Sequence, residues 1–113
     1  MGKLKNQYSC ALVLVNSLIG GKWKLRILWH IHTGNNRFSM LKRHMPEISE
    51  KVLSEQLQDL IDNGLVTRKV ISARPLNIEY SISDQWPELP RITEDLCGFA
   101  RAYAQGKGIE IED

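Results

Sequence analysis

The sequence predicts an α+β domain that is mainly helical, and three observations carry this prediction. A short amphipathic helix over 38–45 is followed by a longer one over 49–63, which closes at Gly64. Two runs rich in β-branched residues come next, over 65–71 and 78–82, and a polar loop containing Pro joins them. Further apolar helices flank this block on both sides. The order is that of a winged helix-turn-helix, whose second helix fits the major groove of DNA.

The chain as a whole suits one such domain. Its 113 residues can bury one ordinary core, and a hydrophobic content of 42% with 25% charged residues is typical of globular proteins. We expect a single domain over 1–113, with an ordered core over 10–105 and flexible ends over 1–7 and 106–113. The longest apolar run, 11–15, is too short to cross a membrane, and no signal peptide is recognised. A cytoplasmic location is therefore expected.

Charge is distributed unevenly along the chain. The net charge is only +2, but residues 1–51 contain nine Lys or Arg and two acidic residues, whereas residues 52–113 contain six and eleven. The first part therefore has a net charge of +7 and the second −5. This asymmetry predicts a basic face for phosphates, although scattered solvated charges would give the same counts.

Two helices are predicted before the central block. The first covers 10–18, is apolar on most sides and ends at a pair of glycines. The second covers 23–31, where apolar residues repeat at helical spacing. Its basic residues, Lys22, Lys24 and Arg26, should lie away from the apolar face.

Local signals mark the ends of the later elements. Ser39 can cap the short third helix, and Ser49 can cap the fourth by accepting backbone N–H groups of its first turn. Residues 72–77 form the tip between the strands, and a last helix covers 86–105, continuous after about Pro90. The predicted core consists of Trp23, Ile27, Leu28, Leu41, Leu53, Leu57, Leu60 and Tyr80.

The fourth helix should present a polar face that can read bases. Lys51, Ser54, Glu55 and Gln58 stand at i, i+3, i+4 and i+7, and side chains of these types hydrogen-bond to base edges. The same face also suits plain solvation. Basic residues before the turn and on the wing, Arg68 among them, suit phosphate or minor-groove contacts. The candidate DNA-binding residues are Arg37, Ser39, Lys42, Arg43, Ser49, Lys51, Ser54, Glu55, Gln58, Lys69 and Arg74.

The cysteines and histidines indicate neither a metal site nor catalysis. Cys10 and Cys97 do not make a disulfide framework or a zinc site, and no nucleophile has a local base. No metal, cofactor or enzymatic activity is therefore expected. Cys10 stands at a helix start near Lys3 and Lys5, which favours a thiolate and makes it a redox-sensing candidate. The alternative is a small packing residue, which is also the interpretation of Cys97.

These motifs together resemble the HxlR-type winged helix-turn-helix regulators of bacteria, over about residues 10–100. The matching segments are Cys10, Leu18 to Trp23, Arg37 to Leu41, Ile48 to Leu57, Leu60, Asp62 to Val66 and Glu79 to Ser83. Departures include Ala11, where the family usually has Pro, and Ser83 to Trp86 in place of Thr-x-x-Gly.

The resemblance implies a homodimeric transcription factor that binds double-stranded DNA. It implies that the first and last helices form the dimer and that the family's sensing cysteine corresponds to Cys10. The candidate dimerisation residues are Leu12, Val15, Leu96, Phe99 and Tyr103. An alternative is a winged-helix module that mainly binds other proteins and binds DNA weakly or not at all. Glu50 and Glu55, on the polar side of the fourth helix, favour it because they would repel phosphate.

Overall fold

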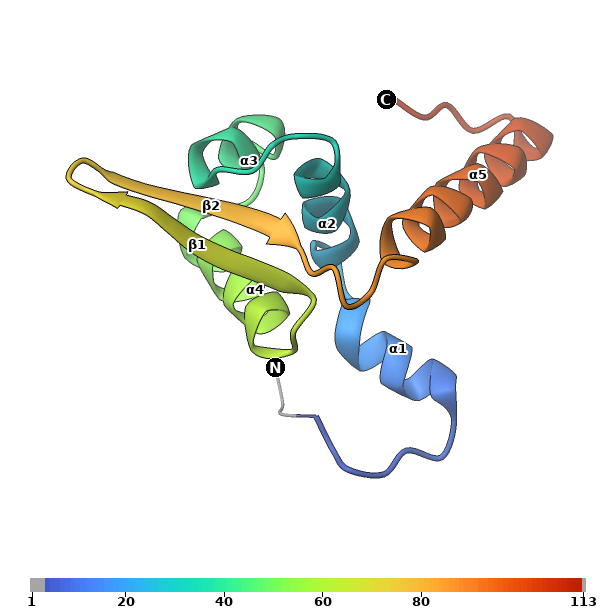
Figure 1. Ribbon diagram of the computed structural model, residues 1–113. Coiled ribbons are helices and arrows are strands. Elements are labelled where there is room, and N and C mark those ends of the chain that lie inside the picture. Colours follow the sequence, from blue (N-terminus) through green and yellow to red (C-terminus); the bar gives the residue numbers. More distant parts are fainter. Residues whose placement is uncertain (1–3, 113) are drawn as a thin grey trace.

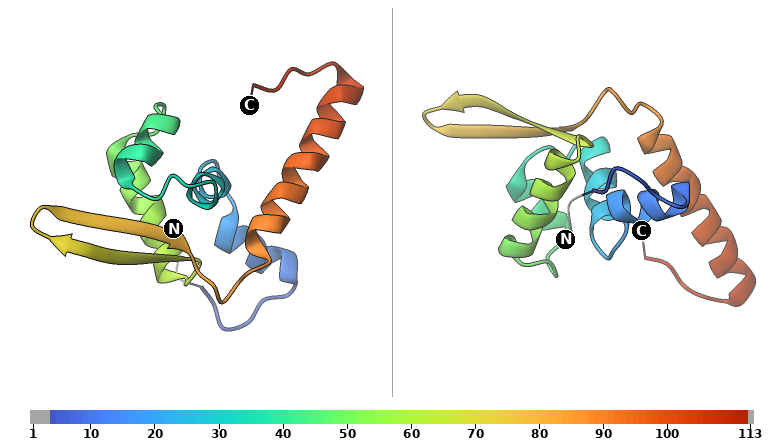
Figure 2. Two further views of the ribbon diagram at one scale, coloured as in Figure 1. Left: turned by 45° about the horizontal axis from the view of Figure 1, so that its top comes forward. Right: turned by 90° about the horizontal axis from the view of Figure 1, so that it is seen from below.

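The computed structural model describes residues 4–112 and contains the predicted succession of helices and strands (Figure 1). The elements are α1 (Ala11–Ile19), α2 (Lys24–His32), α3 (Phe38–His44), α4 (Glu50–Asp62), β1 (Val66–Ala73), β2 (Leu76–Ile82) and α5 (Leu89–Lys107). Helices α2, α3 and α4 pack together, and the β1–β2 hairpin extends from them as a wing (Figures 1 and 2). The predicted fold, a mainly helical winged helix-turn-helix, is confirmed.

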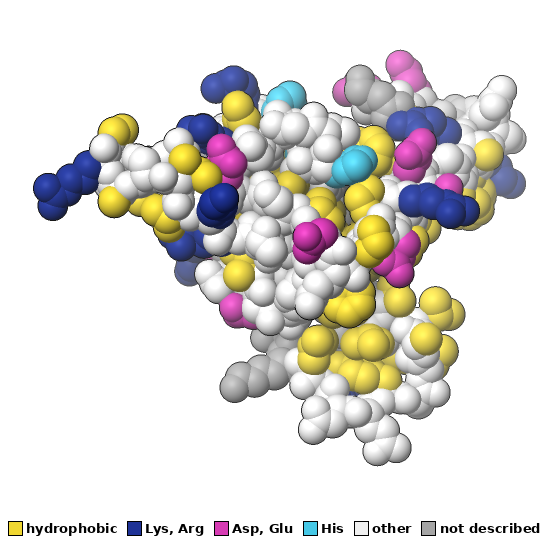
Figure 3. Space-filling model, viewed as in Figure 1, with side chains coloured by type: hydrophobic (Ala, Val, Ile, Leu, Met, Phe, Trp, Pro, Cys, Tyr) yellow, Lys and Arg dark blue, Asp and Glu magenta, His cyan; other side chains and the backbone are white. Residues whose placement is uncertain are grey.

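Helices α1 and α5 extend away from this group on the side opposite the wing tip (Figure 2). Helix α5 begins at Leu89 and reaches Lys107, two residues beyond the predicted ordered core, where Gly108 takes a left-handed φ of 68°. Hydrophobic side chains gather on the surface over α1 (Figure 3). Among the described residues, no helix combines the length and the apolar character needed to cross a membrane.

The cap predicted for α4 is confirmed, and the one predicted for α3 is wrong. The Ser49 hydroxyl accepts the backbone N–H of Val52 at 3.1 Å, and Gly64 follows α4 with φ of 77°. By contrast, α3 begins one residue before Ser39, with Arg37 as its N-cap and no side-chain cap. The preceding carbonyl, of Asn36, accepts the N–H of Tyr80 at 2.9 Å, so β2 holds this segment extended up to the helix.

The wing is longer than the sequence predicted. Strands β1 and β2 pair antiparallel from Val66 opposite Ile82 to Ala73 opposite Leu76, with one irregularity between Val70 and Ser72. Most of the predicted tip, 72–77, is therefore strand, and only two residues make the turn. The sequence signal was misleading because polar and small residues can pair at the end of a ribbon, where little packing is required.

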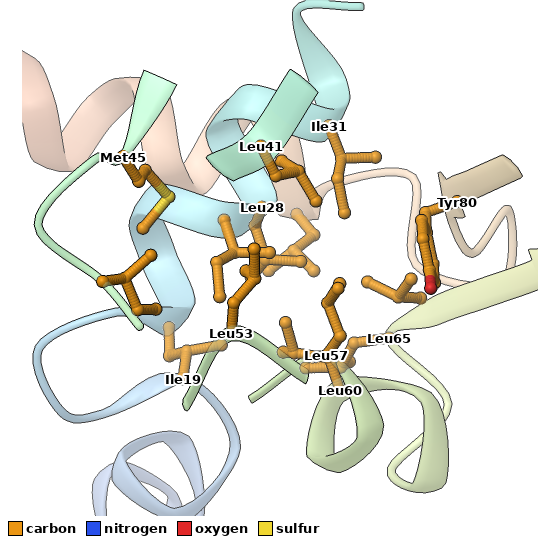
Figure 4. Packing of buried hydrophobic residues seen from close by; sticks show 14 residues of the cluster. Ile19, Leu28, Ile31, Leu41, Met45, Leu53, Leu57, Leu60, Leu65 and Tyr80 are labelled. Carbon is orange, nitrogen blue, oxygen red and sulfur yellow. The ribbon is translucent and has the colours of Figure 1, made fainter. Parts of the chain in front are cut away.

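The core lies where α2, α3 and α4 meet the base of the wing (Figure 4). Seven of the eight predicted core residues are buried, among them Leu41, Leu53 and Leu60, whose side chains are inaccessible. Trp23 is partly buried and packs against the cluster from its edge. Burying one such aliphatic side chain contributes about 1.5–3 kcal/mol, so this cluster fixes how α4 sits on α2 and α3.

Lys24 contradicts the prediction that the basic residues of α2 face away from the core, because it is only 1% exposed. Its ammonium donates a hydrogen bond to Gln56 at 2.9 Å and lies 3.4 Å from Asp59. The buried residues of α2 are Lys24, Ile27, Leu28 and Ile31, at i, i+3, i+4 and i+7. The helical spacing therefore places Lys24 on the buried face of α2. The expectation that it faces solvent rested only on its charge.

Candidate nucleic-acid interface

The polar face of α4 is the centre of the candidate site. Its buried residues, Leu53, Leu57 and Leu60, hold one side of the helix against the core. The opposite side presents the four side chains predicted to read bases, Lys51, Ser54, Glu55 and Gln58, and all four are exposed. This set is called the reading face below, and α4 the recognition helix. An exposed, polar helix face fixed from behind by apolar packing has the form that the major groove accepts.

Gln58 is the only member of the reading face whose side chain has a recorded hydrogen bond among the described residues. Its amide nitrogen donates to Asp62 at 2.8 Å, one turn further along α4. The carbonyl oxygen and the second N–H of this amide are not used by that hydrogen bond and can contact a base. Ser49 is exposed, but its hydroxyl serves as the helix cap.

The wing brings a further cation to the reading face. A cleft of about 560 Å³ separates the recognition helix from the hairpin, and Ser54, Gln58, Arg68 and Tyr80 are among its lining residues. Arg68 therefore borders the reading face. The sequence did not reveal this position, because it showed Arg68 only as one of several basic residues on the wing. The sequence could not show this because the packing of the hairpin against α4 decides which face of β1 meets that helix.

The other predicted wing residues lie further out. Arg74 occupies the two-residue turn at the wing tip and is exposed. Lys69 is exposed and stands opposite Glu79 across the ribbon. Lys and Arg side chains are visible at the wing tip and over the neighbouring α3 (Figure 3). These positions suit contacts with the phosphate backbone at the edge of a duplex rather than with the bases under the recognition helix.

Helix α3 and its N-cap residue supply the remaining cations, and two of them already have partners. Arg37 lies 3.7 Å from Glu79 of β2, and it borders with Ser39 a second cleft, of about 480 Å³, between α3 and the wing. Lys42 donates to the carbonyl of Pro46 at 3.0 Å. Arg43 is exposed at the end of α3. The site therefore has a reading face in the middle and cations toward both edges.

Acidic groups near the site are partly neutralised. The guanidinium of Arg26 binds Glu47 at 2.6 Å, and this hydrogen bond holds the pKa of the Glu47 carboxyl below its ordinary value. Glu50 is exposed in the first turn of the recognition helix, where the helix dipole favours a negative charge. Within residues 4–112, no cluster of His, Cys, Asp and Glu is arranged to hold a metal ion.

The two cysteines occupy different surroundings. Cys10 is exposed at the N-cap of α1. Cys97 is half-buried and lines a cavity of about 610 Å³ between α2, α3 and α5, beside Trp29. Lys3, which the sequence placed near Cys10, lies outside the described residues.

The predicted dimerisation residues all expose apolar surface. Leu12 is 73% exposed, Phe99 70% and Tyr103 55%, and Val15 and Leu96 are also accessible. They lie on α1 and α5, the two helices that extend from the body (Figure 2). A single copy leaves these large apolar side chains exposed to water, which marks the two helix faces as candidate interaction surfaces.

A family model described as HxlR-like helix-turn-helix matches residues 18–107. Among similar proteins, YkvN of Bacillus subtilis (strain 168) is 36% identical over 106 residues, which cover 94% of this chain and 90% of that protein. YdzF of the same organism is 44% identical over 87 residues, which cover 76% and 80%. Both are described as HTH-type transcriptional regulators.

Solved structures show the same fold. The crystal structure of the HTH-type transcriptional regulator ytcD matches with a TM-score of 0.78 and 34% identity, over 85% of this chain and 98% of that one. The redox regulator HypR, in its oxidised form, matches with a TM-score of 0.76 and 30% identity, over 82% and 96%. All four of these similar proteins are described as regulators.

Proposed function

This chain belongs to the HxlR-like helix-turn-helix family of transcriptional regulators, and we propose that it acts as a homodimer that binds specific sequences of duplex DNA. The observation that carries the proposal is the reading face: four exposed polar side chains on a helix whose apolar side packs against the core. Lys51 and Gln58 are the residues suited to guanine and adenine, respectively. The activity is binding, and no bond is made or broken.

Cations at the edges of the site support DNA as the ligand. Arg43 on α3, and Lys69 and Arg74 on the wing, are exposed on either side of the recognition helix. Arg68 borders the reading face itself. Phosphate contacts from such positions orient the protein on the duplex, while the reading face selects the sequence.

The second half of the proposal, a homodimer, rests on the exposed apolar faces of α1 and α5. Burying Leu12, Phe99 and Tyr103 against a second copy would remove from water the most exposed apolar side chains of these helices. Two recognition helices in such a dimer would read half-sites about 34 Å apart, one turn of the double helix.

Selection from a random duplex library, followed by titration of the selected site and of a random duplex at several salt concentrations, tests this function. We expect a clear preference for the selected site and a steep loss of affinity with salt, because each phosphate contact releases counterions. A chain that binds every duplex equally, or none, would contradict the proposal.

One observation favours a different function, a protein-interaction module. Glu50 and Glu55 are exposed on the recognition helix, and Asp62 holds the amide of Gln58. Anionic groups at these positions oppose phosphate. In the library experiment this alternative predicts no preference for any sequence.

We also propose that Cys10 responds to oxidants or electrophiles. Its thiol is exposed at the start of α1, next to the apolar face that a second copy would cover. A modification there would disturb the dimer and, with it, the spacing of the two recognition helices. The similarity to HypR, a redox regulator, supports this assignment.

A further inference from the structure

Lys24 makes a connection between α2 and the recognition helix that hydrophobic packing alone would not provide. Its side chain is 1% exposed, and the acceptors recorded for its ammonium are Gln56, at 2.9 Å, and Asp59, at 3.4 Å. Both acceptors belong to α4. The first residue of α2 therefore holds the recognition helix at two points, almost one turn apart.

The two acceptors lie directly beside the reading face. Gln56 follows Glu55 in the chain, and Asp59 follows Gln58. Each residue that contacts the Lys24 ammonium is therefore next to a residue of the reading face. These four residues also line a common hollow of about 340 Å³ on the surface of α4. Rotation of α4 about its axis would displace both Gln56 and Asp59 relative to the ammonium and so disturb both contacts.

We propose that Lys24 is a positioning residue, which fixes the rotation of the recognition helix and so determines which base edges the reading face meets. The proposal rests on the proposed binding of DNA. Apolar packing through Leu53, Leu57 and Leu60 is not directional. It therefore restricts the distance between α4 and the core more strictly than the rotation of α4 about its own axis. Hydrogen bonds to one fixed ammonium are directional.

Small rotations of α4 about its axis are enough to disturb contacts between its side chains and DNA bases. Side chains extend about 5–6 Å from a helix axis, so a turn of about 10° moves a base-reading group by roughly 1 Å. A displacement of that size takes a hydrogen bond from its optimum to the limit of useful geometry. The Lys24 ammonium is buried and Asp59 is partly exposed. The cost of taking the lysine charge from water offsets much of the attraction, and the best-attested role of a buried charge is to select one arrangement among several.

The test compares the preference for a selected DNA site over random duplex in four variants. Lys24→Met removes the ammonium and keeps the length of the side chain, and Asp59→Asn weakens the same contact from the other side. Lys22→Met is the matched control, because it removes an identical charge from an exposed position two residues earlier. The double variant, Lys24→Met with Asp59→Asn, shows whether the two substitutions act on one interaction.

We expect Lys24→Met to lower the preference at least about fivefold, the discrimination that one good base contact provides. Affinity for random duplex and its salt dependence should be unchanged, since a buried lysine contacts no phosphate. Loss of folded protein would instead lower both affinities together. Lys22→Met should keep the preference, and the double variant should lose no more than Lys24→Met alone.

A folded Lys24→Met protein whose preference stays within about twofold of the wild type would overturn the proposal. An equal loss in Lys22→Met would also overturn it, because charge alone would then be the cause. If circular dichroism shows Lys24→Met to be unfolded, the preference of Asp59→Asn decides by the same criterion. A wild-type chain without any preference would refute the proposed function itself, whereas equal preference in the wild type and in folded Lys24→Met would refute only the role of Lys24.

Discussion

The basic residues in and around the candidate site lie in different surroundings. Arg68 borders the reading face, Arg74 occupies the wing tip, and Arg43 ends α3. Lys24, on the same helix as the exposed Arg26, is almost inaccessible. Residues of identical formal charge therefore lie in three different surroundings, and their sequence neighbours alone do not distinguish these surroundings.

Substitutions on the reading face should separate sequence recognition from general affinity. Lys51→Ala or Gln58→Ala should weaken the selected site by about 1–3 kcal/mol and random duplex much less. Arg43→Ala or Arg74→Ala should weaken both duplexes alike and reduce the salt slope by about one unit. Fluorescence anisotropy at several salt concentrations measures both effects.

Arg91→Ala is the control for these variants, because Arg91 is exposed on α5 rather than on the recognition helix, α3 or the wing. It should leave both affinities and the salt slope unchanged. Equal losses from Lys51→Ala on the two duplexes would show that this lysine contacts phosphate and not a base.

Cys10 should be the faster-reacting thiol. It is exposed, whereas Cys97 is half-buried in the cavity beside α5. Labelling with a maleimide, followed by peptide mapping, should modify Cys10 first, and the Cys10→Ser protein should react slowly. Treatment with an oxidant should lower the DNA affinity of the wild type but not of Cys10→Ser. Unchanged affinity after complete modification would make Cys10 a structural residue.

At the scale of elements, the recognition helix depends on its cap. Ser49→Ala leaves the N–H of Val52 without its acceptor and should lower the free energy of unfolding by about 1 kcal/mol. Ser49→Asp should retain most of the stability, because aspartate also caps a helix and suits the positive end of its dipole. Urea denaturation followed by circular dichroism measures the change. Ser54→Ala, an exposed position within the same helix, should change stability by less than about 0.5 kcal/mol.

Helices α2 and α3 meet at a stacked pair of histidines. The rings of His30 and His44 lie 5.3 Å apart between their centroids. Burial lowers the pKa of His30 below 6.5, the nearby His44 and Arg26 lower it further, and Glu47 opposes them. Protonation of His30 is therefore less favourable in the folded chain than in the unfolded one.

Folding stability should consequently fall on acidification. As the pH drops through 6.5, the unfolded chain binds a proton at His30 before the folded chain does, so the free energy of unfolding decreases. The loss ends below the pKa of the folded state, and the full contribution is present above pH 6.5. Urea midpoints measured from pH 7.5 to about 5 should show this slope, reduced in His30→Gln and unaltered in His32→Gln, whose site is exposed. A slope that His30→Gln leaves intact would assign it to another group.

At the scale of the whole molecule, the homodimer proposed from the exposed apolar faces of α1 and α5 can be tested by substitution. Phe99 is 70% exposed, so Phe99→Asp should not disturb a single folded chain but should break the dimer, since an unpaired charge is costly to bury. Leu96→Asp should act in the same direction. Analytical ultracentrifugation at micromolar concentration should give a dimer for the wild type and monomers, or insoluble protein, for both variants.

Gln105→Asp adds the same charge at another exposed position of α5. Its helical position lies away from Leu96, Phe99 and Tyr103, so this variant should remain dimeric. A wild-type chain that sediments as a monomer at micromolar concentration would contradict the homodimer. The reading face would then have to act in single copies, on one half-site.

Much of this protein follows from local sequence signals. The order of the elements, the cap at Ser49, the turn at Gly64 and most of the core come from short-range spacing, because helix periodicity and capping involve neighbours within about one turn. The polar face of α4 follows from the same periodicity. The resemblance of its motifs to the HxlR-type regulators also required no coordinates, and the family match confirms it.

Only the tertiary structure decided the rest. The segment before α3 is held by the hydrogen bond between Asn36 and Tyr80. Arg68 borders the reading face because the hairpin packs beside α4. Lys24 is the clearest example. Spacing could place it on the apolar side of α2, but a lysine is stable there only if acceptors face it, and these come from Gln56 and Asp59, more than thirty positions away. Periodicity gives the direction of a side chain from its own helix, whereas the packing of a second helix determines what it meets.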